Sequence, residues 1–88
     1  MIIVIGHLSI KPGERETFIE RSLDAVRQAR ALPSCHDFSV SPDPIDENRV
    51  NILEVWESAE ALNTFRGEGP GDDLSALITG ADVKEHEI

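Results

Sequence analysis

Two polar side chains interrupt apolar stretches of this chain, and both are of types that can do chemistry. His7 follows the β-branched run 2–5, and Asn51 breaks a mostly apolar run over 50–55. An imidazole can take a proton from a substrate, and a carboxamide can hold a carbonyl oxygen. Each residue also has a structural interpretation, because His7 can bond to Ser9 on the same strand face and Asn51 to a neighbouring strand. The sequence leaves these alternatives open.

Three further residues are candidates for a binding site or for simpler roles. Trp56 is the only tryptophan, and its ring can pack in the core or form an aromatic wall for a flat organic ligand. His36 is a candidate ligand contact on a predicted edge strand, where exposure or contact with a second copy is the alternative. Cys35 is expected to be a small buried residue. No HExxH motif, paired CxxC motif or Walker loop occurs, so we predict no metal site and no phosphate-binding loop.

Composition excludes several classes of protein. Eighty-eight residues form one domain, residues 1–88, because a second hydrophobic core does not fit in so short a chain. The 17 acidic against 8 basic residues give a net charge of -9, which excludes a nucleic-acid binder and disfavours a membrane surface. The same charge favours neutral aromatic ligands over anionic ones. No apolar run is long enough to span a membrane, and a single cysteine fits the reducing cytoplasm.

The predicted elements follow the order β-α-β-β-α-β. Strands are predicted over residues 2–10, 36–41, 49–56 and 83–88. The first helix is amphipathic, has about five turns and ends near Pro33. The second begins after an N-cap at Ser58 and ends at the glycines of 67–71. A short helical segment over 74–78, capped by an aspartate at 72 or 73, precedes the last strand.

This order is that of the ferredoxin-like fold, an α+β fold with a four-stranded antiparallel sheet. Right-handed crossovers place the first and third strands in the centre and the second and fourth at the edges. The two central strands carry apolar residues on both faces, whereas two helices can cover only one face. Leaving several such side chains in water forfeits about 1.5–3 kcal/mol each. We therefore expect a homodimer joined sheet to sheet.

Two stretches of the sequence resemble domains of the antibiotic biosynthesis monooxygenase family. The first is Ile10-Lys11-Pro12-Gly13 followed by Phe18. The second is EVWES at 54–58, followed by EAL at 60–62 and then Phe65. The resemblance spans nearly the whole chain, and its most specific part is the second stretch. It implies a dimeric α+β barrel built from ferredoxin-like protomers, which agrees with the expected homodimer.

The resemblance also implies an activity, because some members oxidise quinols or aromatic polyketides with molecular oxygen and without metal or flavin. It implies that His7 is the base, that Asn51 contacts a carbonyl, and that Trp56 and Phe65 are aromatic walls. Other members degrade haem, but many relatives carry a histidine where this chain has Phe65, so haem degradation is disfavoured. The chain also has no tyrosine, a residue that some of these monooxygenases use.

Three functions remain open at this point. The first is a small cofactor-independent monooxygenase that oxidises a quinol-like or polycyclic aromatic molecule with molecular oxygen. The second is a non-catalytic small-molecule-binding or stress-response protein that uses the same pocket. The third is an interaction module whose sheet face serves only for assembly. Polar groups that converge on an enclosed apolar cavity would favour the first two functions over the third.

Overall fold

A computed structural model describes residues 1–67 and 74–88 of the chain. Its elements are β1 (Ile2–Ile10), α1 (Arg15–Arg30), β2 (Cys35–Pro42), β3 (Arg49–Trp56), α2 (Ala59–Gly67), the 3₁₀ helix η1 (Leu74–Leu77) and β4 (Ile78–Glu87). This order confirms the predicted βαββαβ pattern. The glycines beyond Gly67 and the predicted cap at residue 72 or 73 lie outside the described residues.

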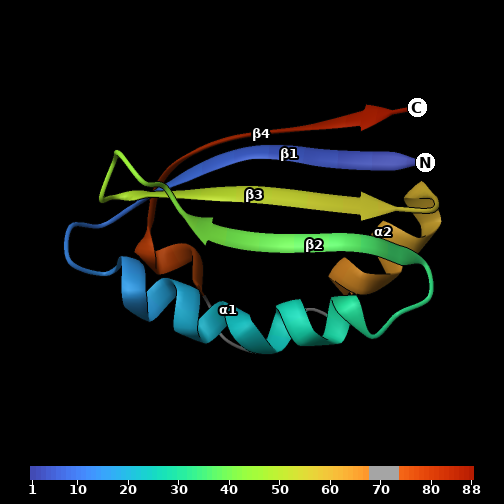
Figure 1. Cartoon of the computed structure of the whole chain (residues 1–88), viewed down its shortest axis with the longest axis horizontal. Helices are drawn as coiled ribbons and strands as arrows, with labels where there is room; N and C mark the ends of the chain where they lie inside the picture. The colour runs from blue at the N-terminus through green and yellow to red at the C-terminus, as the bar shows by residue number, and fades with distance from the viewer. Residues whose placement is uncertain (68–73) are drawn as a thin grey trace.

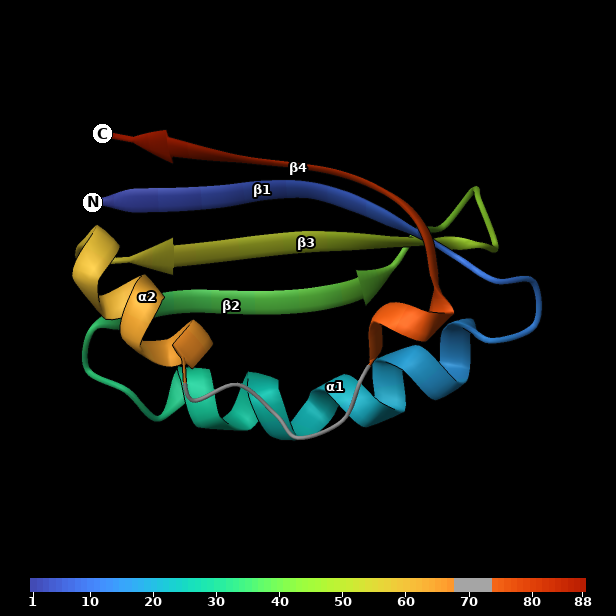
Figure 2. The ribbon, with the colours of Figure 1, turned by 180° about the vertical axis from the view of Figure 1, so that it is seen from behind.

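The strands form one antiparallel sheet in the order β2-β3-β1-β4, so β1 and β3 lie in the centre as predicted. Figures 1 and 2 show the sheet from its two sides, with α1 running along β2 and α2 lying against the ends of β2 and β3. The helices pack on one face only. We call this the helix-covered face, and the opposite face the open face.

The core lies on the helix-covered face in two clusters. One joins the last turn of α1 and the middle of α2 to the sheet, through Ile2, Val4, Ala29, Phe38, Trp56 and Leu62. The other joins the first turn of α1 and η1 to the opposite end of the sheet, through Ile10, Phe18 and Val50 with Leu74 and Leu77 packed against them. The two clusters position both ends of the sheet against the helices.

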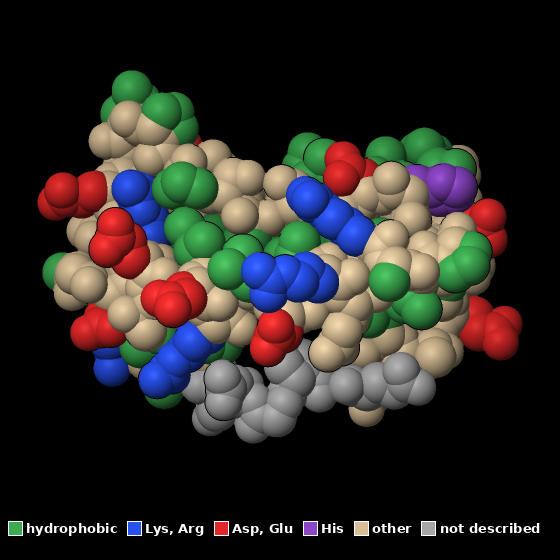
Figure 3. All heavy atoms as spheres, turned by 60° about the horizontal axis from the view of Figure 1, so that its bottom comes forward, with side chains coloured by type: hydrophobic (Ala, Val, Ile, Leu, Met, Phe, Trp, Pro, Cys, Tyr) green, Lys and Arg blue, Asp and Glu red, His purple; other side chains and the backbone are tan. Residues whose placement is uncertain are grey.

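The buried side of α1 differs in part from the predicted apolar stripe. Phe18 and Ala29 are buried as expected, but Leu23 and Leu32 are each 38% exposed. Ser22 is buried instead, and its hydroxyl donates to a backbone carbonyl one turn earlier at 2.7 Å, which satisfies the polar group. The surface over α1 mixes acidic and basic side chains with small apolar areas (Figure 3), as expected for the outer side of an amphipathic helix.

The second helix begins as the sequence predicted. The Ser58 hydroxyl accepts a hydrogen bond from the backbone N–H of Ala61 at 3.1 Å, which is the geometry of an N-cap. Leu62 is then buried in the core and Phe65 packs against it. These contacts fix the position of α2 over the sheet.

The predicted start of the last strand is wrong, because β4 begins at Ile78 and not at residue 83. Residues 78–82 show no clear apolar alternation, but they pair along β1, with Ile78 opposite Ile10. The two backbones approach closely at Gly6, where a Cβ atom would overlap the backbone of Asp82. The pairing with β1, and not side-chain pattern, therefore extends this edge strand.

Candidate functional site

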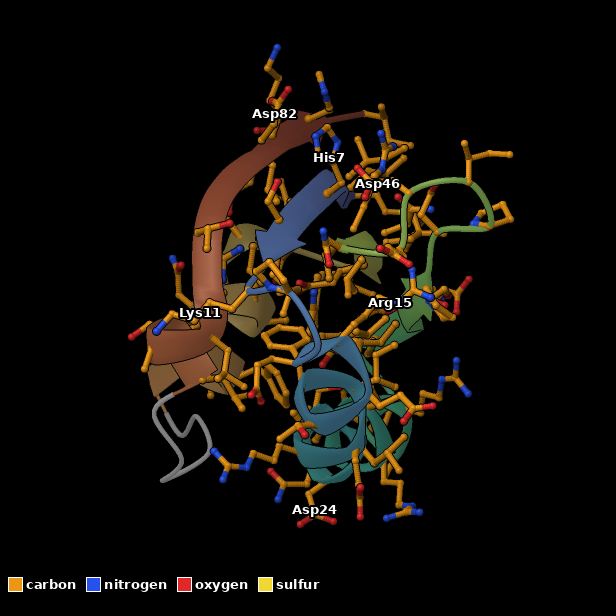
Figure 4. The ribbon with its side chains drawn as sticks, turned by 90° about the vertical axis from the view of Figure 1, so that its left-hand side faces the viewer. His7, Lys11, Arg15, Asp24, Asp46 and Asp82 are labelled. Carbon is orange, nitrogen blue, oxygen red and sulfur yellow. The ribbon has the colours of Figure 1, made fainter. Side chains whose placement is uncertain are left out.

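The open face brings together the two polar residues that interrupt the apolar strands. The register pairs His7 with Asn51 of β3 on one side and with Asp82 of β4 on the other, and it pairs Asn51 with Ser41 of β2. Directly paired residues of antiparallel strands point to the same face. Asp82, His7, Asn51 and Ser41 therefore form a row across the sheet, which we call the polar row. Figure 4 shows His7 and Asp82 on the side away from α1.

Beside the polar row the open face is hollowed into a concavity of about 520 Å³, which we call the sheet-face concavity. Its apolar part comes from Ile5, which is 49% exposed, and from Leu53, its register partner. The full lining is Ile5, Gly6, Asp37, Ser39, Ser41, Arg49, Asn51, Ile52 and Leu53. An apolar floor with a few polar groups at its edge is typical of a small-molecule site.

Asn51 is held in one orientation at the edge of this concavity. Its Oδ1 accepts a hydrogen bond from Arg49 Nε at 2.8 Å, and its Nδ2 donates to Asp43 Oδ1 at 3.0 Å. These partners require the amide oxygen to face Arg49 and the amide nitrogen to face Asp43. The second hydrogen of Nδ2 has no acceptor within the described residues, so Asn51 can still donate to a ligand.

Asp43 anchors Asn51 as a carboxylate. Its Oδ2 accepts backbone N–H groups of Asp46 at 2.8 Å and Ile45 at 3.0 Å. Three hydrogen bonds lower the pKa of Asp43 from 3.8 to about 2. The largest effect comes from the backbone N–H of Asp46, followed by the side-chain amide of Asn51 and the backbone N–H of Ile45. Arg49 Nε lies 3.6 Å from Oδ1 and adds a smaller effect. Asp43 is therefore charged at neutral pH and holds the hairpin in place.

Arg15, at the start of α1, holds the loop that contains Asp43. Its Nη1 donates to the backbone carbonyls of Asp46 at 2.9 Å, Asp43 at 3.1 Å and Arg49 at 3.4 Å. Figure 4 shows Arg15 and Asp46 at the same end of the molecule. One guanidinium thus connects α1 to the β2–β3 hairpin, and through the hairpin to Asn51.

His7 is partly buried in the centre of the polar row. The hydrogen bond to Ser9 that the sequence suggested does not form, and within residues 1–67 and 74–88 the imidazole has no hydrogen-bond partner. The interpretation of His7 as an interior histidine satisfied by Ser9 is therefore wrong. The ring stands between Asn51 and Asp82 with its polar atoms available.

The aromatic residues of the predicted site lie on the other face of the sheet. Trp56 is fully buried at 0% exposure and packs with Phe65 at 5.1 Å and with Phe38 at 6.3 Å between ring centroids. Phe38 and Phe65 are 5.6 Å apart. The structure therefore does not bring Trp56 and Phe65 into one pocket with His7 and Asn51. Complete burial favours core packing over an aromatic wall for Trp56.

A second opening lies on the helix side and reaches one of these rings. It has a volume of about 380 Å³ and we call it the α2 opening. It is lined by Leu32, Ser34, Ser58, Glu60, Ala61, Thr64 and Phe65. Phe65 is therefore the predicted aromatic contact that a ligand can reach on this side.

Glu54 is a partly buried acid that the sequence analysis passed over. Its Oε1 accepts a hydrogen bond from Trp56 Nε1 at 3.0 Å, and burial raises the pKa of its carboxyl against the opposing effect of that bond. Arg66 lies nearby and pairs with Glu85 at 2.7 Å. The spacing of Glu54 and Trp56 could have predicted this contact, because residues two apart on a strand point to the same face.

His36 and Cys35 lie at the exposed beginning of β2. His36 Nε2 is 3.6 Å from Glu57 Oε1, and its side chain is 45% exposed. Cys35, which was expected to be buried, is only partly buried, and its Sγ donates to the Asp37 carbonyl at 3.3 Å. Burial still raises the pKa of the Cys35 thiol. Neither residue contributes to the lining of the sheet-face concavity.

Two further properties concern the part of the chain that the structure describes. There, no three His, Cys, Asp or Glu side chains lie close enough together to hold a metal ion. No helix among those residues combines the length and the apolar character that crossing a membrane requires.

Comparison with known proteins gives consistent results. The profile of the family "antibiotic biosynthesis monooxygenase" matches residues 1–70. An uncharacterized protein of Synechocystis sp. is 32% identical over 62 residues, which cover 70% of this chain but only 42% of that protein. The match thus spans less than half of the curated relative.

Solved structures agree with this result. A candidate antibiotic biosynthesis monooxygenase from Nitrosomonas europaea superposes with a TM-score of 0.86 at 16% identity, covering 99% of this chain and 97% of the other. A second, from Chloroflexus aurantiacus, reaches 0.79 at 27% identity, covering 97% and 89%. Since the family profile covers most of the chain and the fold agrees over nearly all of it, this chain belongs to the antibiotic biosynthesis monooxygenase family.

Proposed function

We propose that this protein is a small cofactor-independent monooxygenase that oxidises a quinol-like or polycyclic aromatic compound with molecular oxygen on the open face. The observation that carries the proposal is the pairing of His7 with Asn51 beside a concavity of about 520 Å³ with an apolar floor. Family membership supports oxygenase chemistry, and two similar solved structures also carry the name antibiotic biosynthesis monooxygenase.

His7 is the proposed base of this site. Its imidazole is partly buried and unpartnered within the described residues, so a ring nitrogen can accept a proton from a phenol or from an anthrone-like CH₂ group. Asn51 is the proposed carbonyl contact, because one amide hydrogen is held by Asp43 and the other is available. Its fixed orientation means that no rearrangement is needed when the substrate binds.

The proposed reaction balances without an external reductant. Deprotonation gives a substrate anion, which passes one electron to oxygen, and the two radicals combine to a peroxide at the same carbon. His7 returns its proton, a second C–H proton leaves, and water is lost. A CH₂ group and O₂ thus become a carbonyl group and H₂O. The substrate supplies all the electrons, and exclusion of bulk water protects the intermediates.

A homodimer joined sheet to sheet is the proposed means of excluding water. Ile5 is 49% exposed on the open face, where Ile3, Leu53 and Val55 are only partly buried. The charges of that face nearly cancel, since it carries the acids Asp37, Asp43 and Asp82 together with the bases Arg49 and Lys84. The chain's surplus of negative charge therefore lies mostly elsewhere and does not oppose face-to-face pairing. We place this dimer in the cytoplasm, which is supported by the free Cys35.

Oxygen consumption tests the function directly, with a panel of hydroquinones and anthrones and with protein freed of metal and flavin. We expect turnover by the wild type and a loss of about a hundredfold in each of His7→Ala and Asn51→Ala. His86→Ala is the matched control, because His86 pairs with Ile3 on the same face but away from the polar row. Unchanged rates in both variants, or an equal loss in the control, would overturn the assignment.

Other outcomes of the same assay identify the alternatives. Saturable binding of a panel member without oxygen uptake would indicate the non-catalytic binding protein, and neither binding nor uptake would leave the interaction module. Phe65 and His36 stay predicted ligand contacts, whereas the fully buried Trp56 would contact a ligand only if the core around it opened. If Phe65→Ala lowers the rate and His7→Ala does not, turnover takes place at the α2 opening.

A further inference from the structure

Arg49 stands at the polar end of the sheet-face concavity with part of its guanidinium unused. Its Nε donates to Asn51 Oδ1 at 2.8 Å and lies 3.6 Å from Asp43 Oδ1. Neither Nη1 nor Nη2 of Arg49 donates a hydrogen bond within the described residues. The side chain is 39% exposed and contributes to the concavity lining. The guanidinium of Arg49 is thus held through Nε, while Nη1 and Nη2 can still donate to a ligand.

Other arginines of the fold are used differently. Arg15 donates its Nη1 to backbone carbonyls, Arg30 donates its Nε to the Phe38 carbonyl at 2.8 Å, and Arg66 pairs with Glu85. These arginines connect one element to another. Arg49 instead uses Nε alone, which donates to a residue two positions away on its own strand and lies 3.6 Å from Asp43 of the adjoining loop.

Asp43 does not use up the charge of Arg49. The Asp43 carboxylate already accepts N–H groups from Ile45, Asp46 and the side chain of Asn51. Its contact with Arg49 is a longer one through Nε only, so the Nη1–Nη2 edge remains available. That edge presents two parallel donors, which match the two oxygens of a carboxylate.

The rest of the concavity determines which way a ligand would lie. Arg49 is the only cationic residue in its lining, and Asp37 is the only anionic one. Asp37 pairs with Val55, at the end of β3 away from Arg49, whereas Asp43 lies 3.6 Å from Arg49 Nε and already accepts three N–H groups. An anionic group is therefore favoured on the Nη1–Nη2 edge of Arg49, which Asp43 does not contact. Leu53 lies four residues from Arg49 along β3, roughly 13 Å, with Ile5 beside it. A fused-ring compound can reach from the guanidinium to this apolar floor.

We infer that the ligand of the sheet-face concavity is an aromatic carboxylic acid, with its carboxylate on the Nη1–Nη2 edge of Arg49 and its rings over Ile5 and Leu53. This inference rests on the proposed function for the location of the site, and it narrows the substrate to electron-rich aromatics that carry a carboxylate. The net charge of the chain does not oppose it, because a fixed cation in contact with the ligand outweighs charges beyond about 8 Å in physiological salt.

Binding of a non-reacting pair of probes tests this inference. The probes are 2-naphthoate and its neutral analogue 2-naphthamide, titrated into full-length protein and followed by calorimetry and by amide chemical shifts. We expect 2-naphthoate to bind at least about tenfold more tightly, with shift changes at Ile5, Asn51 and Leu53. Arg49→Gln should remove the preference, and Arg49→Lys should keep part of it because the charge remains without the fork.

Arg21→Gln is the matched control, since Arg21 is exposed on α1 and takes no part in the concavity. Circular dichroism and the amide spectrum report whether Arg49→Gln keeps the fold. Equal affinity for the two probes, no binding of 2-naphthoate at millimolar concentration, or a preference that persists in folded Arg49→Gln would each overturn the inference. Because the probes are not oxidised, such a result leaves the oxygen-consumption assay to decide the proposed function on its own.

Discussion

The two faces of the sheet use the same strands for different purposes. On the helix-covered face, Val4 and Trp56 are almost or completely buried, and the acid beside them, Glu54, accepts a hydrogen bond from Trp56. On the open face, the neighbouring residue Ile5 is 49% exposed and stands next to a polar row. One face is a filled core and the other is an unfilled surface.

This difference separates stability from function in the molecule. The rings of the helix-covered face contact one another, so they contribute to the free energy of unfolding and leave little room for a ligand. The polar groups of the open face are held in place but keep unused donors, at Asn51 Nδ2 and at the Arg49 fork. Substitutions on the first face should therefore change stability, and those on the second should change binding.

The largest effect is expected from truncating the central ring of the core. Trp56→Ala should lower the free energy of unfolding by about 3–5 kcal/mol, because it removes a fully buried ring and the partner of Phe65. Urea unfolding followed by circular dichroism measures this loss. His36→Ala, at an exposed position, is the control and should change stability by less than about 0.5 kcal/mol. A loss below about 1 kcal/mol for Trp56→Ala would contradict the description of this face as a packed core.

Adjacent residues of β1 give a sharper comparison. Val4 and Ile5 point to opposite faces and are 1% and 49% exposed. Val4→Ala should lower the free energy of unfolding by about 1.5–3 kcal/mol at any protein concentration. Ile5→Ala should change it by less than about 1 kcal/mol in the monomer. If the proposed dimer forms, Ile5→Ala also weakens it, which analytical ultracentrifugation detects as a higher monomer fraction.

Measuring unfolding at several protein concentrations decides whether the open face is exposed in a monomer or covered in a dimer. Unfolding midpoints of the wild type that do not change with protein concentration, together with a monomer mass in the ultracentrifuge, would overturn the proposed dimer. The Val4→Ala result would stand in either case. Val4→Ala and Ile5→Ala together thus separate the contribution of the core to the free energy of unfolding from the contribution of the dimer.

The same contrast explains what the sequence could predict. β3 has the predicted bounds Arg49–Trp56, because turn residues precede it and an N-cap follows it. The start of β4 could not be predicted, since Ile78–Asp82 pairs with β1 through backbone atoms and shows no apolar alternation. The local sequence pattern predicts the bounds of a strand when its side chains alternate between apolar and polar. It fails when the strand is extended by backbone pairing with a neighbouring strand.

Two members of the candidate site could be predicted from the sequence, but the grouping of the site could not. His7 and Asn51 stood out because each breaks an apolar run, and the structure pairs them. β1 has apolar residues at both odd and even positions, so alternation cannot tell which set meets the helices. Trp56 and His7 therefore came out on opposite faces. Arg49 has no sequence signal of its own, because its unused donors depend on which partners the hairpin supplies.

A smaller effect of opposite sign is expected at Glu54, the partly buried acid that accepts a hydrogen bond from Trp56. The pKa of Glu54 is raised in the folded state, so the folded state holds this proton more tightly than the unfolded one. Stability from Glu54 is therefore complete below its unfolded pKa of about 4.3 and is lost as the pH rises through the higher folded value. Glu54→Gln keeps an acceptor for Trp56 Nε1 and removes the charge. It should raise the urea midpoint at pH 7 and have no effect near pH 4.

Glu20→Gln makes the same change at an exposed position of α1 and serves as the control. A lower midpoint of Glu54→Gln at pH 7, with the control unchanged, would mean that attraction between Glu54 and Arg66 outweighs the cost of burial. That outcome would contradict the raised pKa and its assignment to burial.

The smallest effect concerns the anchor of the open face. Asp43 has its pKa lowered from 3.8 to about 2, so the stabilisation it provides is complete above the ordinary value and is lost as the pH falls from there toward 2. Asn51→Ala removes one of its donors and should raise the Asp43 pKa while the backbone bonds from Asp46 and Ile45 keep it below normal. Carboxyl ¹³C chemical shifts followed from about pH 1.5 to 6, a range that contains both the folded and the unfolded pKa, measure this change.

Asp24, exposed on α1, provides the internal reference in the same titration. An Asp43 pKa that stays near 2 in Asn51→Ala would mean that Asn51 is not held by this carboxylate, and the amide would then be free to turn. A fixed amide is what distinguishes a preformed carbonyl contact from a surface asparagine. The Asp43 titration therefore tests, without any substrate, whether the open face is organised in advance for binding.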